Sequence, residues 1–237
     1  MKKAIKRTLW ITGILFGLLI LAAITFLIYF RSATKEMTPA ETKAVNDSVF
    51  CIKNGFVNAY IFKSKNQYIL FDAGMSEKRF LAEMKGLGIM PEQISTVFLT
   101  HTDGDHTGAM GLFKNCIVYM HKDEEQMING QNSKGPFKTI WKYGPYRLLN
   151  NNDTIRIDGL RIRIIHTPGH TPGSSCFSVN DNYLITGDNI NVVEGKADHF
   201  VEMFNMDTEK QIESIKVLPE LNTFQYILTA HHGIFKN

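Results

Sequence analysis

The sequence predicts an α+β protein in which helices cover two packed β-sheets, with one membrane-spanning helix at the N-terminus. Three observations lead to this class. An uncharged apolar run occupies residues 9–30, short segments rich in Val, Ile, Tyr and Phe recur after residue 49, and two amphipathic helical patterns interrupt them. Sets of strands that are each followed by a helix favour two packed sheets over one alternating parallel sheet.

The N-terminus has the features of an uncleaved membrane anchor. Residues 1–8 are basic, and the next 22 residues, Leu9 to Phe30, carry no charge. At ~1.5 Å per residue such a helix spans roughly 33 Å, close to a hydrocarbon core of about 30 Å. A cleaved signal peptide is the competing interpretation, but its apolar region is normally ~7 to 15 residues long. More basic residues precede the run than follow it, which predicts a cytoplasmic N-terminus and an extracytoplasmic domain.

The rest of the chain is predicted to be a stalk, residues 31–46, followed by one domain, residues 47–237. The stalk segment is polar and lacks apolar periodicity. Residues 36–237 carry 20 basic and 23 acidic residues, so this part lacks the positive charge that nucleic-acid binding requires. No particular protein partner is indicated.

The three cysteines form no CxxC pair, which argues against a zinc ribbon or a redox motif. Cys51, Cys116 and Cys176 are predicted to pack in the interior, and one disulfide remains an open alternative.

Short β-branched and aromatic segments separated by turn residues predict the strands of the domain. In the first half the expected strands are 49–53, 57–63, 67–71, 96–100 and 117–119. In the second half they are 154–157, 160–165, 174–179, 183–186 and 226–229. Ser76 and Asp207 can cap helices over 77–87 and 208–218. Residues 122–128 could be helical, but the rest of the segment up to 152 has no clear pattern.

The residues with the clearest chemical signal lie in the sequence ThrHisThrAspGlyAspHisThrGly at 100–108. Four potential metal ligands, His101, Asp103, Asp105 and His106, follow directly from an apolar strand. Imidazole and carboxylate groups donate lone pairs to divalent cations, and a loop at a strand end can turn such side chains toward one point. This cluster therefore predicts a metal site.

Three further candidates, His170, Asp188 and His232, each come at or soon after the end of a predicted strand. The ordered pattern of HxDxDH, then His, then Asp, then HisGly resembles the metallo-β-lactamase superfamily. The early AspxGly element at Asp72 and Gly74 adds to this resemblance, which covers residues ~49 to 233. The resemblance implies a four-layer αββα sandwich with the active site along one edge of the two sheets.

The resemblance also implies a dinuclear centre with two divalent metal ions. By position, His101, Asp103 and His170 would hold one metal, and Asp105, His106 and His232 the second. Asp188 would bridge the two metals, and Asp72 would support the ligand loop from behind. Asp103 stands where the family usually has histidine, and its harder oxygen ligand makes Mn or Fe an alternative to Zn. The bridging Asp188 indicates the glyoxalase II and lactonase-like branch of the family.

The function that follows is hydrolysis of a small-molecule substrate. A hydroxide shared by the metals would attack an ester, thioester, lactone or related bond, with Asp105 orienting it or accepting a proton. Two alternatives remain open: a di-iron oxidoreductase on the same fold, and a non-catalytic metal-binding module. No substrate-binding residue is assigned, and specificity is expected from the segments 122–152 and 189–206.

The other histidines are given structural roles. His231 adjoins His232, and because neighbouring strand residues point to opposite faces, only one of them is expected in the site. The following Gly233 favours His232. His166 and His121 are expected to end strands, and His199 to lie on the surface. Three aromatic residues, Trp141, Tyr143 and Tyr146, could line a substrate pocket or form a small core beneath a loop.

Overall fold

The computed structural model describes residues 2–135, 138–193 and 196–237, and divides the chain into two units, Met1–Glu36 and Met37–Asn237. Each unit is considered by itself. The segments expected to carry specificity include Pro136, Phe137, Glu194 and Gly195, which lie outside the described residues.

The first unit is a single helix, α1 (Lys2–Thr34). Residues Leu9–Thr34 are long and apolar enough to cross a membrane, judged by length and composition. The helix extends beyond the predicted span of 9–30 at both ends, because no proline or glycine cap stops it.

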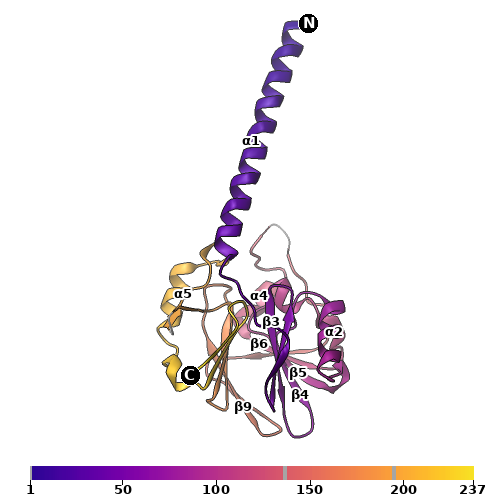
Figure 1. The fold of residues 1–237 in the computed structure, drawn as a ribbon, viewed down its shortest axis with the longest axis vertical. Coiled ribbons are helices and arrows are strands. Elements are labelled where there is room, and N and C mark those ends of the chain that lie inside the picture. The colour runs from indigo at the N-terminus through magenta and orange to yellow at the C-terminus, as the bar shows by residue number, and fades with distance from the viewer. Residues whose placement is uncertain (1, 136–137, 194–195) are drawn as a thin grey trace. The chain divides into compact units, whose positions relative to one another are not determined.

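The second unit is built on two sheets, and in its described part the first sheet has seven strands in sequence order (Figure 1). They are β1 (Lys43–Asn46), β2 (Val49–Asn54), β3 (Val57–Lys63), β4 (Tyr68–Phe71), β5 (Ile94–Phe98), β6 (Ile117–His121) and β7 (Tyr146–Leu149). Strands β1 to β4 form antiparallel hairpins, whereas β4 to β7 pair in parallel. The carboxyl ends of β4, β5 and β6 therefore meet at one edge of this sheet.

The described part of the second sheet has the strand order β15-β14-β11-β10-β9-β8. Its strands are β8 (Thr154–Ile157), β9 (Leu160–His166), β10 (Ser175–Val179), β11 (Tyr183–Gly187), β14 (Tyr226–Thr229) and β15 (Ile234–Lys236). A separate ribbon joins β12 (Asn191–Val193) to β13 (Lys196–Asp198). Because β11 and β14 are parallel, their carboxyl ends also lie side by side.

Successive side chains of each strand point to opposite faces of its sheet, and this alternation separates the core between the sheets from the layers outside them. In β3, Tyr60 and Phe62 join the core between the sheets, while Ala59 and Ile61 pack toward the outer face of the first sheet. Helix α2 (Glu77–Gly86) covers that outer face with Phe80 and Met84. On the far side of the second sheet, Ile215 at the end of α5 (Thr208–Ile215) packs on a third cluster. The predicted αββα sandwich is confirmed.

Each free cysteine lies in a different one of these three clusters. Cys51 is buried between the sheets, Cys116 beneath α2, and Cys176 under the layer of α5. Their separation excludes the alternative of a disulfide and confirms their packing role.

The predicted stalk is wrong at its C-terminal end. Residues Lys43–Asn46 form β1 and pair with β2, and Ala40 exchanges backbone hydrogen bonds of 2.8 Å with the side chain of Asn58. No strand was predicted here because only Ala44 and Val45 are apolar in this segment. The sequence also failed to predict β7, the β12–β13 ribbon and β15, which have only three or four residues each.

Candidate metal centre

The predicted ligands lie just beyond the carboxyl ends of strands from both sheets. The loop after β5 carries His101 to His106, the loop after β9 carries His170, and Asp188 follows β11 directly. His231 follows β14 by two residues. The site is therefore assembled where the edges of the two sheets meet.

The first group of donors consists of His101, Asp103 and His170. The Nε2 atom of His170 lies 3.1 Å from His101 Nε2 and 3.1 Å from Asp103 Oδ2, and His101 Nε2 lies 3.6 Å from the same carboxylate oxygen. Both histidines are fully buried, while the Asp103 side chain is 26% exposed. The ammonium of Lys134 also reaches this group, 2.5 Å from Asp103 Oδ2 and 2.7 Å from His170 Nε2.

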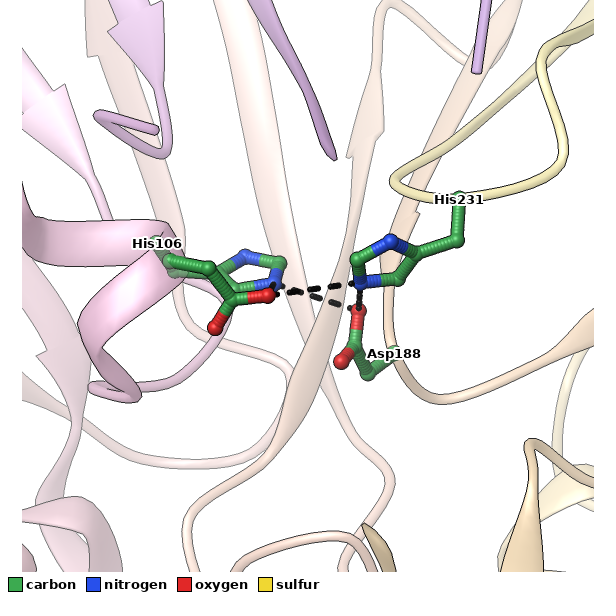
Figure 2. Close-up of side chains that lie close together, drawn as sticks. His106, Asp188 and His231 are labelled. Carbon is green, nitrogen blue, oxygen red and sulfur yellow. Dashed lines mark ion pairs between the residues drawn. The ribbon is translucent and has the colours of Figure 1, made fainter. Parts of the chain in front are cut away.

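The second group consists of Asp105, His106, Asp188 and His231. Figure 2 shows the rings of His106 and His231 with a nitrogen of each facing the Asp188 carboxylate. Asp188 Oδ1 lies 3.2 Å from His106 Nε2 and 3.0 Å from His231 Nε2. Asp105 Oδ2 lies 3.8 Å from His106 Nε2 and 3.6 Å from His231 Nε2.

Asp188 connects the two groups because its carboxylate oxygens face different histidines. While Oδ1 faces the second group, Oδ2 lies 3.4 Å from His170 Nε2 and 3.9 Å from His101 Nε2. The structure thus brings six of the predicted ligands together, with Asp188 in the central position.

The remaining predicted ligand, His232, lies outside both groups, and its neighbour His231 lies in the second. His231 enters the second group, and its Nδ1 donates a 2.7 Å hydrogen bond to the carbonyl of Phe56. Strand β14 ends at Thr229, whose backbone N–H and hydroxyl both bond the carbonyl of Gly233, so residues 230–233 form a tight turn. In that turn the ring of His232 packs 6.1 Å from Phe200. One of the two adjacent histidines thus lies among the grouped donors, and it is His231, whereas the HisGly pattern favoured His232.

The other ring nitrogen of each histidine is occupied by an oxygen. His106 Nδ1 donates to Asp72 at 2.9 Å, His170 Nδ1 lies 3.2 Å from Asn205 Oδ1, and His101 Nδ1 lies 3.1 Å from the Thr100 hydroxyl. Together with the bond from His231 to Phe56, these contacts fix every ring with Nε2 toward the centre. Such supporting bonds are typical of histidines that bind metals.

Asp72 is hydrogen-bonded to the ligand loop from behind. Its carboxylate accepts hydrogen bonds from the backbone N–H and the hydroxyl of Thr100, both at 2.8 Å, in addition to the bond from His106. Close packing brings the second sheet to the same place. Gly187 has a φ of +55°, and a Cβ there would lie 2.3 Å from the Thr100 hydroxyl oxygen, so only glycine allows this approach.

Electrostatic interactions in the site favour an ionised Asp188 and a neutral His101. Burial opposes the charge of Asp188, but His231 and His106 hold its pKa well below the usual value. Burial and the nearby His106 and His170 lower the pKa of His101 to about 4. This is the protonation state in which an imidazole and a carboxylate bind a cation. In the second group Asp188, against the effect of burial, raises the pKa of His106 and of His231, so a cation that binds there displaces their protons.

Two buried polar atoms that form no hydrogen bond indicate that the site can hold metal ions. Among the described residues, His106 Nε2 and Asp188 Oδ1 are buried and form no hydrogen bond, although buried polar atoms nearly always have a partner. Donor distances of 3.0 to 3.8 Å within the groups suit an ion held at ~2.0 to 2.2 Å from each ligand.

A third set of donors, His121, Asp123 and His166, lies apart from this centre. The two imidazole rings are stacked 3.7 Å apart at an angle of 11°. Because a histidine binds metal in the plane of its ring, parallel stacked rings cannot direct their lone pairs at one ion. His121 and His166 end β6 and β9, as predicted, and His166 Nε2 donates to the carbonyl of Pro172 at 2.9 Å.

The remaining candidates are structural in this fold. His199 is 29% exposed and pairs with Asp198 and Glu202 on the surface. The aromatic residues Trp141, Tyr143 and Tyr146 pack against the core beneath α2, which supports the alternative of a small core over a pocket lining.

Comparison with known proteins assigns the family. The sequence profile described as the Metallo-beta-lactamase superfamily matches residues 52–231. The chain belongs to this superfamily. The match ends at His231 and therefore includes both groups of donors.

Relatives of known sequence include the atrochrysone carboxyl ACP thioesterase of Aspergillus fumigatus, which is 28% identical over 138 residues. This alignment covers 56% of the present chain and 29% of the relative. The probable metallo-hydrolase YqgX of Bacillus subtilis is 28% identical over 140 residues, which cover 55% of this chain and 64% of that protein. The chain thus spans only part of the length of these relatives.

Solved structures with the same fold include a β-lactamase from Chitinophaga pinensis, with a TM-score of 0.63 and 21% identity over 83% of this chain and 80% of that one. The class B3 di-zinc metallo-beta-lactamase LRA-12 from an Alaskan soil metagenome has a TM-score of 0.62, with the same identity and coverage. At this level of identity the likeness concerns the fold.

Proposed function

We propose that the protein is a metal-dependent hydrolase with a dinuclear centre. The observation that carries this proposal is the position of Asp188, whose two carboxylate oxygens each face a separate group of donors. A carboxylate in this position can bind two cations at once. This arrangement also supports the glyoxalase II and lactonase-like branch, for which a bridging aspartate is expected.

In the proposed enzyme His101, Asp103 and His170 hold one metal, and Asp105, His106 and His231 hold the other. Two divalent ions would polarise a substrate carbonyl and lower the pKa of water toward neutrality. The chain's own residues determine the geometry, because the Nδ1 bonds to Asp72, Asn205 and Phe56 hold the rings in place. The Asp105 carboxylate, with its side chain 21% exposed, can orient the attacking water or accept its proton.

The proposed substrate is a small molecule with an electrophilic carbonyl, namely an ester, thioester or lactone. The thioesterase among the relatives supports the thioester class, and the β-lactamases with the same fold add β-lactams to the panel. The test is hydrolysis of this panel by the full-length protein in detergent, with Asp188→Ala as the control. Turnover of one class by the wild-type protein and none by the variant is expected, and equal rates in both would refute the proposal.

Zinc is the proposed metal, and Asp103 supports a second candidate. A carboxylate in the first group is a harder ligand than histidine and suits Mn or Fe as well as Zn. Iron in both positions would favour a di-iron oxidoreductase. Elemental analysis of protein purified without chelator separates these cases, and iron together with no hydrolysis would favour the redox enzyme.

The apolar helix α1 is proposed to anchor the protein in a membrane, with its N-terminus in the cytoplasm. Basic residues Lys3, Lys6 and Arg7 precede the candidate span, which supports this orientation. Resistance to alkaline extraction from membranes, combined with protease access to the catalytic domain from the outside only, is the expected result. Release of the protein by alkali would argue against the anchor.

A further inference from the structure

Glu124 is a buried carboxylate that is not one of the proposed metal ligands. It lies in the short segment Lys122–Glu124 after β6, within the charged sequence LysAspGluGlu, where an exposed side chain would be expected. Instead its side chain is fully buried. Burial raises its pKa to about 7, which reflects how unfavourable this environment is for a carboxylate.

The two oxygens of Glu124 bind two different ligand loops. Oε1 accepts hydrogen bonds from the backbone N–H and the hydroxyl of Thr102, at 2.8 and 2.7 Å. Oε2 accepts from the hydroxyl of Thr171 at 2.6 Å and from the backbone N–H of Gly173 at 3.1 Å. One carboxylate thus joins the loop of the first sheet to a loop of the second.

The residues that Glu124 holds are next to the first group of donors. Thr102 stands between His101 and Asp103 in the sequence, and Thr171 follows His170 directly. His101 and Asp103 follow a strand of the first sheet, whereas His170 follows a strand of the second. The distance between these donors therefore depends on how the two loops are joined. Glu124 links the two loops directly through its two oxygens.

The second loop is shaped to receive this carboxylate. A Cβ at Gly173 would lie 2.1 Å from the backbone nitrogen of Glu124, so a side chain at this position would prevent the approach. The Thr171 hydroxyl is held in turn by Ser174 Oγ at 2.8 Å. Close backbone approach and a second layer of hydrogen bonds indicate a rigid link.

We propose that Glu124 is the positioning residue of the first metal site, setting the distance between His170 and the pair His101 and Asp103. This inference rests on the proposed dinuclear function. Glu124 is too deeply buried to touch substrate, and it acts through the two loops that it joins. The second site shares the loop after β5 through Asp105 and His106. Its other ligands, Asp188 and His231, follow β11 and β14 and lie outside the two loops that Glu124 joins, so the second site depends on Glu124 less.

Glu124→Gln tests this role with almost no change in shape. An amide has one acceptor oxygen, and in either orientation its NH₂ group faces a backbone N–H, that of Thr102 or that of Gly173. Backbone N–H groups cannot act as acceptors, so the link fails on one side. Glu125→Gln is the matched control, because this neighbour is partly exposed and bonds Tyr146 instead.

The measurement is stepwise Zn²⁺ affinity of the full-length protein in detergent, by competition with a chromophoric chelator. His170→Ala and His231→Ala identify which step belongs to each site. Glu124→Gln is expected to weaken the first-site step by roughly 10- to 100-fold, the usual effect of removing a residue that supports metal ligands, and to change the other step much less. Glu125→Gln should leave both steps as in the wild-type protein.

Thr171→Val serves if Glu124→Gln does not fold, since it removes one hydroxyl bond and keeps the carboxylate. It is expected to weaken the same step by a smaller factor. A lower melting temperature with unchanged Zn²⁺ affinity in either variant would overturn the proposal, because that is the result of a purely structural role. Failure of the wild-type protein to bind two equivalents would refute the dinuclear function itself, and is seen without any variant.

Discussion

The two sheets contribute to the metal centre in different ways. The first sheet supplies four candidate ligands, His101, Asp103, Asp105 and His106, from one loop after β5. The second sheet supplies three, His170, Asp188 and His231, each from a different strand end. Local sequence therefore determines half of the site, whereas packing of one sheet on the other determines the rest. Contacts that join the sheets should control metal binding as strongly as the ligands themselves.

Replacing Asp188 should have the largest effect, because its carboxylate faces both groups. We expect Asp188→Ala to lose metal affinity by more than about 100-fold, beyond the usual effect of a supporting residue, and to lose turnover with it. Metal content and hydrolysis measured on the same sample provide the test. Near-normal values would show that the two groups do not form one centre.

Replacing His231 and His232 separately distinguishes the two histidines at the end of β14. His231→Ala should lower the metal content from two equivalents to about one, because its Nε2 belongs to the second group. His232→Ala should keep two equivalents, since His232 belongs to neither group of donors. The opposite pattern would restore the assignment that the sequence alone predicted.

Lys134 places a positive charge beside the first group of donors, where it contacts Asp103 and His170. Lys134→Met should raise the Zn²⁺ affinity of the first site by roughly three- to tenfold, because an ammonium opposes a nearby dication and is partly screened by solvent. Lys138→Met, on the exposed part of the same loop, is the control. A weaker first site in Lys134→Met would indicate that the ammonium helps to hold Asp103 in position.

His121 tests the junction of the sheets, where its ring stacks on His166 from the other sheet. Burial and the neighbouring His166 lower the pKa of His121 to about 4, whereas in the unfolded chain it is about 6.5. Between pH 6.5 and 4 the imidazole therefore binds a proton in the unfolded state but not in the folded state. The free energy of unfolding falls as the pH drops through this range.

In His121→Phe the ring contact is kept and this titration is lost. The free energy of unfolding of the metal-free variant should depend less on pH in that window than that of the wild-type protein. Denaturant titrations at several pH values provide the measurement. Identical pH dependence in both proteins would exclude His121 as a source of acid lability.

The fold and half of the site follow from the sequence because their signals are local. The strands from β2 to β6, the sandwich order and the HxDxDH loop depend on alternation, turn residues and one short motif. The choice of His231 over His232 depends on a turn closed by Thr229 and Gly233, which no local pattern specifies. Glu124 and Lys134 were missed because charged residues in polar segments are normally exposed, and only tertiary packing brings them to the site.

Metal stoichiometry of the full-length protein tests the central claim most directly. Elemental analysis after purification without chelator, in parallel for the wild-type protein and Asp188→Ala, measures it. The dinuclear centre predicts about two equivalents of divalent metal in the wild-type protein and a large loss in the variant. One equivalent or fewer in the wild-type protein after reconstitution with Zn²⁺, or equal retention by both proteins, would contradict it.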